Sequence, residues 1–220
     1  MLLLENERLD DLQIGGLYII QNPREYCFTS DAVALANFAK CKSGGKLVDL
    51  CSGSGVIGIL MNAKNKISKV YLVELQSHLA DMSARSVEYN HLDNIKVVNA
   101  PLQNIHKTIG EGVYDTVVCN PPYKKSGTTN LYNTKDTITI ARHEIMVTLE
   151  DIISESAKLL KYGGDMYICN KEERLTDIMF LSRKYGLEPK EMKILSSNSG
   201  ANVILIKCRK GGKSGIKILC

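Results

Sequence analysis

The sequence predicts an α/β fold in which helices cover both faces of a seven-stranded, mostly parallel sheet. Three observations support this prediction. Seven candidate strands alternate with candidate helices, a glycine-rich turn joins the first buried strand to an apolar helix, and the last two candidate strands are close together in the sequence. The chain has 220 residues, 44% hydrophobic and 24% charged, so it is long enough to form one sizeable core.

Apolar runs and helix-boundary residues place each element along the chain. The first helix has a plausible N-cap at Thr29 or Ser30, and the longest helix has a plausible C-cap at Tyr162-Gly163-Gly164. We expect strands at residues 46–51, 69–74, 95–98, 114–119, 165–169, about 190–195 and 203–207. We expect helices at residues 29–40, 55–64, 77–90, 142–162 and 172–185. The sequence contains no internal repeat, so we expect a single domain over residues 1–220.

A glycine-rich turn, Ser52-Gly53-Ser54-Gly55, separates the first strand from its helix. Glycine lets a ligand approach the backbone, and the start of the helix offers unpaired N–H groups. Asp49 lies at the end of the first strand, and Glu74 ends the second, where a Rossmann-like site binds ribose hydroxyls. A carboxylate beside the loop suits the cationic S-adenosylmethionine (SAM) and would repel a pyrophosphate. The pattern therefore favours SAM, and NAD or a purely structural turn are the alternatives.

A second motif, Asn120-Pro121-Pro122-Tyr123, follows the fourth strand at the edge of the sheet where α/β proteins place reactive groups. The side-chain oxygen and the carbonyl oxygen of Asn120 are both acceptors, and Pro121 has no N–H to compete. Together they could hold both hydrogens of a planar amino group while its ring stacks on Tyr123. The alternative is an ordinary turn after a strand. The nearby glycine loop favours the first interpretation.

Composition limits the environment and the partners of the chain. No stretch approaches 18 apolar residues, and Glu5 and Glu7 closely follow the apolar start, so we expect no membrane span and no signal peptide. The seven cysteines are scattered without metal-ligand spacing, which favours free thiols in a reducing cytoplasm and no metal site. The net charge of +4 is only mildly basic.

Taken together, the motifs resemble those of class I SAM-dependent methyltransferases, whose Rossmann-like sheet has seven strands with the last one antiparallel. Over nearly the whole chain, the sequence is most similar to the bacterial tRNA(Val) adenine N6-methyltransferase family, which modifies adenine 37 beside the anticodon. Residues 21–32 resemble the entrance segment of that family, and residues 141–144 resemble a run after its catalytic motif. The resemblance implies an entrance segment at 1–44, a core at 45–210, and a basic tail at 211–220 that is either naturally short or truncated.

The motifs and the resemblance give three groups of candidate site residues. Catalysis would involve Asn120, Pro121, Pro122 and Tyr123. SAM would contact Phe28, Thr29, Asp49, Cys51, Gly53, Ser54, Gly55, Glu74, Leu75, Leu102 and Asn120. RNA would contact Lys124, Lys125, Arg142, His143, Lys207, Arg209 and Lys210, which we expect at the rim of the site. A merely solvated basic terminus is the alternative for the last three, and His143 is a less favoured candidate for a general base.

The sequence departs from the related adenine N6 enzymes in one respect that concerns the cofactor. Many of them have an acidic residue after the third strand, near the SAM adenine, whereas residues 99–103 contain no carboxylate here. The backbone N–H of Leu102 could still meet the adenine ring, and Gln103 could substitute for the acid. We expect either this substitution or a lower affinity for SAM.

The activity implied by the resemblance is transfer of a methyl group from SAM to the exocyclic N6 amine of an adenine in tRNA. We expect a cytoplasmic enzyme that is a monomer or a weak dimer. A protein-glutamine N5 methyltransferase is an alternative, because a planar amide fits the same two acceptors, although only about 45 residues precede the glycine loop. An rRNA guanine N2 methyltransferase and a non-catalytic SAM- or RNA-binding module are further alternatives.

Overall fold

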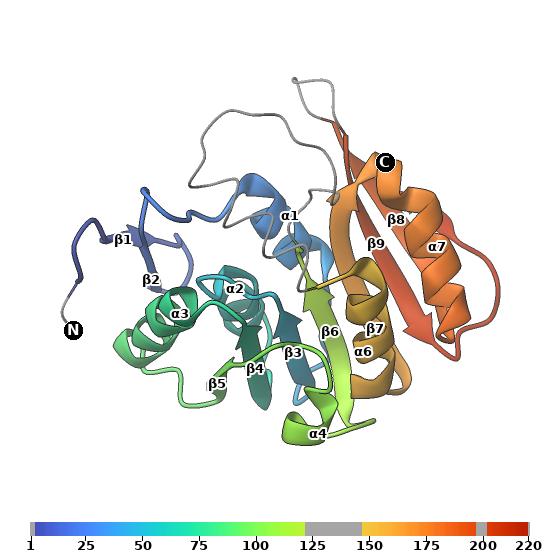
Figure 1. Cartoon of the computed structure of the whole chain (residues 1–220), viewed down its shortest axis with the longest axis horizontal. Helices are drawn as coiled ribbons and strands as arrows, with labels where there is room; N and C mark the ends of the chain where they lie inside the picture. The colour runs from blue at the N-terminus through green and yellow to red at the C-terminus, as the bar shows by residue number, and fades with distance from the viewer. Residues whose placement is uncertain (1–2, 122–146, 197–201, 220) are drawn as a thin grey trace.

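The structure, a computed structural model, describes residues 3–121, 147–196 and 202–219 (Figure 1). Its strands are β1 (Arg8–Asp11), β2 (Tyr18–Gln21), β3 (Lys46–Leu50), β4 (Lys69–Glu74), β5 (Ile95–Asn99), β6 (Tyr114–Cys119), β7 (Leu160–Lys171), β8 (Leu187–Leu195), β9 (Val203–Lys210) and β10 (Lys217–Leu219). Its helices are α1 (Ser30–Phe38), α2 (Val56–Lys64), α3 (Ser77–Tyr89), α4 (His106–Ile109), α6 (Leu149–Leu159) and α7 (Leu175–Lys184), with a short 3-10 helix η1 (Glu172–Arg174). The predicted α/β fold is confirmed.

The main sheet of the described chain has eight strands in the order β10-β8-β9-β7-β6-β3-β4-β5. Strands β7, β6, β3, β4 and β5 pair in parallel, and β10 pairs in parallel with β8. Strand β9 lies between β7 and β8 and is antiparallel to both. In chain order β9 is the seventh strand of this sheet, and it is antiparallel as predicted. The predicted strand count was wrong by one, because the short β10 follows β9 in the chain and pairs at the edge of the sheet next to β8.

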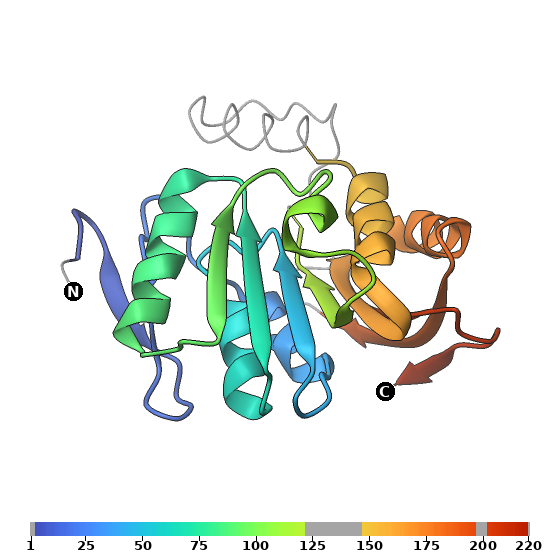
Figure 2. The ribbon, with the colours of Figure 1, turned by 90° about the horizontal axis from the view of Figure 1, so that it is seen from below.

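Helices cover both faces of the sheet (Figure 2). Buried apolar side chains form two clusters between the helices and the sheet. Helices α1 and α2 contribute Leu35 and Leu60 to the layer on one face. Helices α6 and α7 contribute Ile153 and Ile178 to the layer on the other face. No helix in the described ranges is long and apolar enough to cross a membrane.

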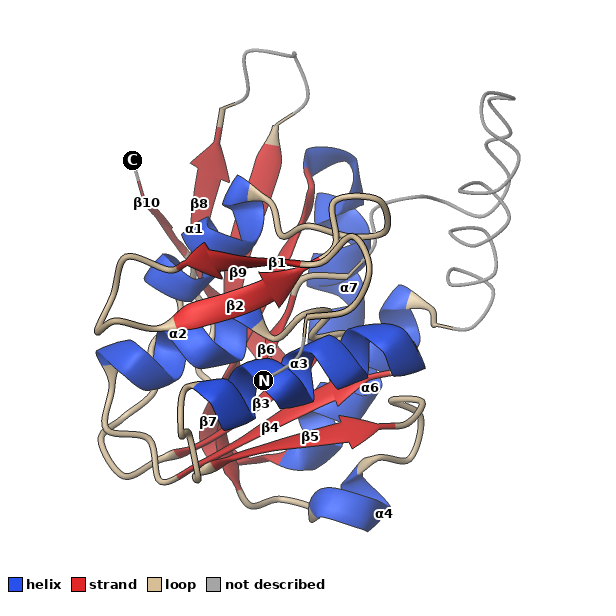
Figure 3. Cartoon of the chain, turned by 90° about the vertical axis from the view of Figure 1, so that its left-hand side faces the viewer, coloured by secondary structure: helices blue, strands red, loops and turns tan. Residues whose placement is uncertain are grey.

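A small hairpin, β1 paired antiparallel with β2, lies outside helix α3 (Figure 3). The Ile20 N–H donates to Ser86 Oγ at 2.9 Å, and the Tyr18 N–H donates to Asn90 Oδ1 at 2.9 Å. These bonds hold the N-terminal segment against the helix that follows β4. Sequence patterns did not predict this hairpin, which lies at the opposite end of the molecule from β10 (Figure 2).

The predicted helix at 142–162 needs correction at both ends, since Val147 and Thr148 precede the helix and residues 160–162 follow it. Thr148 and Asp151 form a reciprocal capping box at the start of α6, which ends at Leu159. Residues 160–164, including the expected C-cap, belong to β7, where the pairing with β6 shifts between Tyr114 and Thr116. Gly163 and Gly164 therefore lie in an irregular part of a strand and do not cap a helix. Strand pairing replaces the last turn of the predicted helix. Residues 142–146 lie outside the described residues.

Candidate cofactor and active site

The carboxyl ends of β3, β4 and β6 lie side by side and bring the predicted motifs together. Leu50 of β3 is in register with Val73 of β4 and with Cys119 of β6. Glu74 and Asn120 each follow one of these partners directly in the chain. The glycine loop, the acid of the second strand and the start of the Asn-Pro motif therefore share one edge of the sheet, which we call the cofactor edge.

The glycine loop adopts the backbone conformation that its sequence suggests. Gly53 and Gly55 have φ values of +55° and +88°. A Cβ on Gly55 would lie 2.5 Å from Ser83 Oγ and 2.9 Å from Leu72 Cδ1, so only glycine fits between α2 and its neighbours. Cys51 also has a positive φ, +56°, an uncommon conformation for a residue with a side chain. The loop is thus built for a tight turn against packed neighbours.

Asp49 is fully buried beneath the loop. Its Oδ2 accepts a hydrogen bond of 2.9 Å from the Gly58 N–H, which ties β3 to α2. Its Oδ1 is buried and has no hydrogen-bond partner in the described part of the chain. Burial raises the pKa of Asp49 to about 8, and the nearby Glu74 adds to this rise. A cation beside Oδ1 would favour the ionised form, so Asp49 is suited to a positively charged ligand.

Glu74 reaches back from the end of β4 to the glycine loop. Its Oε2 accepts from the Gly53 N–H at 2.8 Å, and its Oε1 accepts from the Gln76 N–H at 2.9 Å. These two bonds fix the orientation of a buried carboxylate that still has lone pairs to accept further hydrogen bonds. The position matches the predicted acid of the second strand, and its contact with a ribose stays a prediction.

Several further polar atoms around the loop are buried without a hydrogen-bond partner among the described residues. They are the hydroxyl oxygens of Ser52, Ser54 and Ser83. With Asp49 Oδ1 they make four unpaired buried oxygen atoms around one loop. Because folded proteins pair nearly all buried polar groups, these atoms indicate a place for a polar ligand or for water. The residues present thus fit a small polar and cationic cofactor such as SAM.

Tyr26 covers the loop from the N-terminal side. A Cβ on Gly53 would lie 3.0 Å from Tyr26 Cε1, so the aromatic ring and the loop backbone are in close contact. Burial, with Asp49 and Glu74 nearby, raises the pKa of Tyr26 to about 12, so the phenol stays neutral. The sequence patterns indicate Tyr26 only as part of the entrance segment and do not predict its contact with the loop.

The two residues proposed from that segment take other positions. Phe28 packs with the apolar layer of α1 and α2, and its N–H donates to Gln21 Oε1 at 2.7 Å. Thr29 is exposed at the N-cap position of α1 and makes no side-chain capping bond. Their contact with SAM stays a prediction.

Comparisons with known proteins identify the family of the chain. A family model described as the methyltransferase small domain matches residues 30–186, a range that includes the glycine loop, Glu74 and Asn120. The chain belongs to this family. It is a SAM-dependent methyltransferase, and S-adenosyl-L-methionine is its cofactor, as the sequence predicts.

The methyltransferase is similar to several curated relatives. It is 24% identical to a tRNA1(Val) (adenine(37)-N6)-methyltransferase of Photobacterium profundum over 163 residues, which cover 73% of this chain and 67% of that protein. It is 27% identical to a ribosomal RNA large subunit methyltransferase G of Aeromonas salmonicida over 131 residues, which cover 57% of this chain and 29% of that protein. The matched regions thus span about two thirds or less of the relatives.

Solved structures share the fold of the methyltransferase at lower sequence identity. A predicted O-methyltransferase of Agrobacterium tumefaciens superposes with a TM-score of 0.66 at 20% identity, covering 86% of this chain and 84% of that one. M. jannaschii TYW2 in complex with AdoMet superposes with a TM-score of 0.64 at 13% identity, covering 96% of this chain and 89% of that one. These matches confirm the Rossmann-like fold class.

The structure places the first half of the predicted catalytic motif of the methyltransferase. Asn120 is half-buried directly after β6, and Pro121 is buried beside it. The remaining candidates, Pro122, Tyr123, Lys124, Lys125, Arg142 and His143, lie outside the described residues. The catalytic and RNA-binding roles of these eight residues stay predictions.

The remaining residues considered for cofactor contact, Leu75, Leu102 and Gln103, follow β4 and β5. Leu75 follows Glu74, and its carbonyl accepts from Asn99 Nδ2 at 3.0 Å. Leu102 is buried, and its side chain belongs to the core layer that α6 covers. Gln103, considered as a substitute for the missing acid, directs its amide to Asp151 Oδ2 at 3.5 Å. The SAM contacts of these residues stay predictions.

Two of the three basic residues of β9, Arg209 and Lys210, lie away from the predicted rim. Asp165 of β7 is in register with Arg209, whereas Ile168, which pairs with the terminal Cys119 of β6, is in register with Ile206. Since β9 is antiparallel, Arg209 and Lys210 lie toward the opposite edge of the sheet from Asn120. The expected position at the rim is therefore wrong for these two residues.

Internal partners also hold the basic side chains of β9. Lys207 Nζ lies 2.9 Å from Glu191 Oε1, and Arg209 donates to both oxygens of Asp165 at 2.7 and 2.9 Å. Lys210 Nζ donates to the carbonyls of Ala157 and Leu160. RNA contact by these residues stays a prediction, and it would have to compete with these bonds.

Proposed function

We propose that this methyltransferase transfers a methyl group from SAM to the N6 amine of an adenine in tRNA, with adenine 37 of tRNA1(Val) as the target. The observation that supports the proposal is the placement of Asn120-Pro121 directly after β6, the strand that pairs with β3, at the same edge as Asp49 and Glu74. The similarity to the Photobacterium profundum enzyme supports the choice of adenine and tRNA. Monomeric or weakly dimeric assembly remains part of the proposal.

Bound SAM supplies an electrophilic methyl group on a sulfonium. The exocyclic amine of adenine is a poor nucleophile, because its lone pair is delocalised into the ring. Asn120 Oδ1 and the Asn120 carbonyl accept the two amine hydrogens and draw the nitrogen toward a tetrahedral geometry. With SAM held by Asp49 and the glycine loop, the nitrogen lone pair would form the new bond to the methyl carbon, and the electron pair of the broken carbon–sulfur bond would go to sulfur.

The proton balance requires no strong base in the protein. Methyl transfer leaves a positively charged amine, which is acidic and releases one proton to water. Tyr123 provides the aromatic surface on which the extruded base stacks. Asp49 and the glycine loop hold the cofactor, so binding and chemistry use different residues of one sheet edge.

An rRNA substrate is the second candidate, and the similarity to the Aeromonas salmonicida enzyme favours it over a protein substrate. The acceptor pair of Asn120 also suits a guanine amine or a glutamine amide, so the motif by itself does not separate these targets. The substrate class must come from the reaction product.

The test is transfer of labelled methyl from SAM to total bacterial tRNA, followed by mass spectrometry of the nucleosides. We expect label in N6-methyladenosine with the wild-type protein. We expect Asn120→Ala to bind the cofactor nearly normally and to lower turnover about a hundredfold or more. Asn65→Ala is the matched control, because Asn65 lies at the C-terminal end of α2, away from the cofactor edge.

The outcomes separate the candidates. Label in ribosomal RNA or in a protein glutamine, but not in tRNA, would replace the tRNA proposal by the corresponding alternative. Full turnover in Asn120→Ala would refute the acceptor role of Asn120. Cofactor binding without transfer to any of these substrates would favour a non-catalytic module.

A further inference from the structure

Seven lysines gather at the edge of the sheet opposite the cofactor edge. They lie at the C-terminal ends of α1 and α2, in the loops that follow, and at the starts of β3, β4 and β7. The set, which we call the basic edge, consists of Lys40, Lys42, Lys46, Lys64, Lys66, Lys69 and Lys161. Five are exposed, and Lys69 and Lys161 are half-buried.

Strand register and loop bonds bring these residues together. Lys46 of β3 is in direct register with Lys69 of β4. The loop before β3 is bonded to the loop before β4, since the Gly44 N–H donates to the Lys66 carbonyl at 2.6 Å and the Ser68 N–H donates to the Gly45 carbonyl at 2.9 Å. The basic edge is therefore one continuous surface.

Few of these lysines have an acidic partner. Asp115 forms ion pairs with both Lys42 and Lys161, so one carboxylate serves two ammonium groups. Lys64 donates to the neutral amide oxygen of Asn37. The other four lysines have no acidic partner among the described residues, in contrast to Arg183 and Lys184, which pair with Glu188 and Glu150.

This arrangement stores repulsion between like charges. Lysines directly opposite each other on neighbouring strands destabilise a sheet, and the C-terminal ends of α1 and α2 offset only part of this effect through their dipoles. A chain of phosphate groups would relieve the repulsion and release counterions. The charge pattern therefore fits a polyanion better than it fits a structural role.

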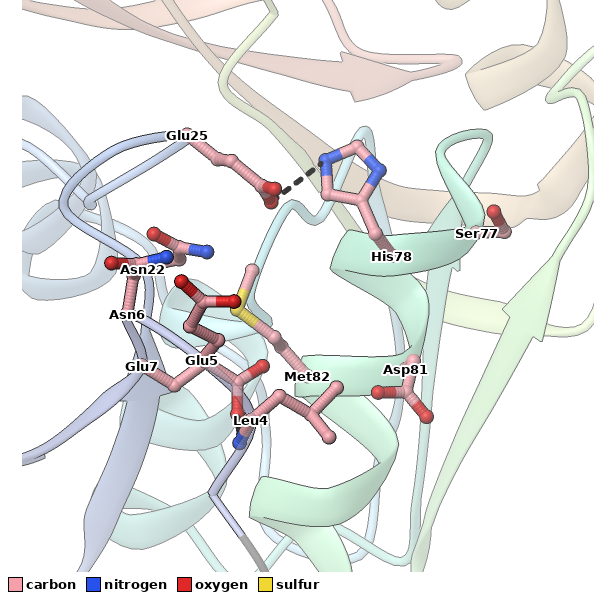
Figure 4. Close-up of a pocket in the computed structure, with 10 residues that line it drawn as sticks. All are labelled: Leu4, Glu5, Asn6, Glu7, Asn22, Glu25, Ser77, His78, Asp81 and Met82. Atoms are coloured by element: carbon pink, nitrogen blue, oxygen red, sulfur yellow. Dashed lines mark hydrogen bonds and ion pairs between the residues drawn. The ribbon is translucent and has the colours of Figure 1, made fainter.

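The flank near the N-terminal end of α3 has the opposite character. A cavity of about 550 Å³ there is lined by residues that include Glu5, Glu7, Glu25 and Asp81 (Figure 4). His78 lies 3.6 Å from Glu25, and Arg85 pairs with Glu7 and Asp81. The remaining acidic groups would repel an RNA backbone, so a bound RNA would avoid this flank.

The two edges of the sheet are close enough for one RNA to reach both. β6 has six residues, which gives a separation of about 20 Å. One turn of a nucleic-acid duplex spans about 34 Å. A stem whose loop presents its base at the cofactor edge would extend beyond the opposite edge.

We propose that the basic edge binds the sugar-phosphate backbone of the tRNA outside the anticodon loop. This inference rests on the proposed tRNA substrate. The basic edge adds affinity for the whole tRNA and does not take part in the chemistry, which occurs at Asn120.

The test compares full-length tRNA with an isolated anticodon stem-loop. The variant Lys40→Glu/Lys46→Glu/Lys66→Glu reverses three exposed lysines that lack an acidic partner among the described residues. The matched control Lys184→Glu/Lys193→Glu/Lys217→Glu makes the same change in net charge on α7, β8 and β10, on the side of the sheet farthest from β3 and β4. Binding of each RNA is measured by fluorescence anisotropy over a range of salt concentrations, and binding of S-adenosylhomocysteine reports that each variant is folded.

We expect the basic-edge variant to bind full-length tRNA about tenfold to a hundredfold more weakly at about 0.15 M salt. The slope of log K against log salt should fall by about 2–3, since three phosphate contacts are lost. Binding and methylation of the stem-loop should change much less. An unchanged affinity for full-length tRNA, or an equal loss in the control variant, would overturn the inference.

Methylation of the stem-loop by wild type keeps this test separate from the proposed function. If neither RNA is methylated, the proposed function fails. If both are methylated and the variant binds full-length tRNA normally, only the basic edge fails. Loss of binding to anionic lipid vesicles, with tRNA binding unchanged, would overturn the inference in favour of a membrane surface.

Discussion

The glycine loop and strand β9 differ in whether their polar side chains have hydrogen-bond partners. Around the loop, buried oxygen atoms of Asp49, Ser52 and Ser54 have no hydrogen-bond partner in the part of the chain that the structure describes. On β9, carboxylates hold Lys207 and Arg209, and carbonyls hold Lys210. Because folded proteins pair nearly all buried polar groups, the contrast indicates a ligand site at the loop and a structural role on β9.

This difference predicts that cofactor affinity and folding stability depend on different residues. Unpaired buried groups destabilise the cofactor-free fold, and a cofactor that satisfies them stabilises it as its concentration rises. The ion pairs of β9 need no ligand to act. Substitutions at the loop should therefore change cofactor affinity, whereas substitutions on β9 should change folding stability alone.

The largest effect on cofactor affinity is expected at Asp49. Asp49→Ala removes the carboxylate whose Oδ1 has no partner among the described residues, and we expect SAM to bind about tenfold to a hundredfold more weakly, since a charged hydrogen bond is lost. Asp49→Asn is the matched variant, because its amide oxygen can still accept from the Gly58 N–H. Isothermal titration calorimetry measures both. Unchanged affinity in both variants would show that the loop binds SAM without this charge.

The raised pKa of Asp49 predicts that the affinity for SAM depends on pH. Burial and the nearby Glu74 raise the pKa of Asp49 from its ordinary value of 3.8 to about 8 in the cofactor-free protein. Because the cationic cofactor favours the carboxylate, its binding below about pH 8 must release a proton. Affinity should therefore rise with pH by up to about tenfold per pH unit and level off above about pH 8.

Folding stability should show the opposite trend. Between about pH 4 and about pH 8 the unfolded chain has released the Asp49 proton and the cofactor-free fold retains it. The folded state binds more protons in this window, so stability falls as the pH rises.

Titrations of the protein with SAM at several pH values, in buffers of different ionisation enthalpy, measure the proton release that accompanies binding. Asp49→Asn should remove this contribution, and an equal pH dependence in that variant would assign it to another group.

A smaller effect on affinity is expected at Tyr26. Its ring lies against the Gly53 backbone, so Tyr26→Ala should expose the loop to water and weaken SAM binding about threefold to tenfold. Tyr26→Phe keeps the ring and should bind nearly as well as wild type. If Tyr26→Ala binds SAM more tightly, the ring obstructs the cofactor in the free protein and does not support it.

Elements with a strong local pattern could be predicted from the sequence. The runs 69–74 and 114–119 are apolar and rich in β-branched residues, and both are strands with the predicted bounds. The long helix was predicted beyond its true end because the pairing of Leu160 with Tyr114 depends on a neighbouring strand. Strand β10 has three residues and exists only through its pairing with β8, so no local signal indicates it.

The candidate site shows the same division between local and long-range information. Spacing along the chain placed Asp49, Glu74 and Asn120 at strand ends, and the parallel sheet brings these ends together. The contact between Tyr26 and Gly53 joins two distant positions through the path of the N-terminal segment, which spacing does not reveal. The position of Arg209 depends on the direction of β9, which a cluster of basic letters does not specify.

The smallest effect is expected on β9 and tests the other side of the comparison. Arg209→Gln removes two bonds to Asp165, but the Arg209 side chain is 44% exposed and Lys207 still lies 3.5 Å from Asp165. We expect a loss of about 1 kcal/mol or less in the free energy of unfolding, measured by urea denaturation. SAM affinity should not change.

The double variant Arg209→Gln/Asp165→Asn is the control for the charge left on Asp165. A weaker SAM affinity in either variant would mean that β9 and the glycine loop are coupled, so that the ligand site and the structural strand do not act independently. Weaker tRNA binding with unchanged stability would instead support the predicted RNA contact of Arg209. In that case the bonds to Asp165 would hold the side chain in place until RNA competes for it.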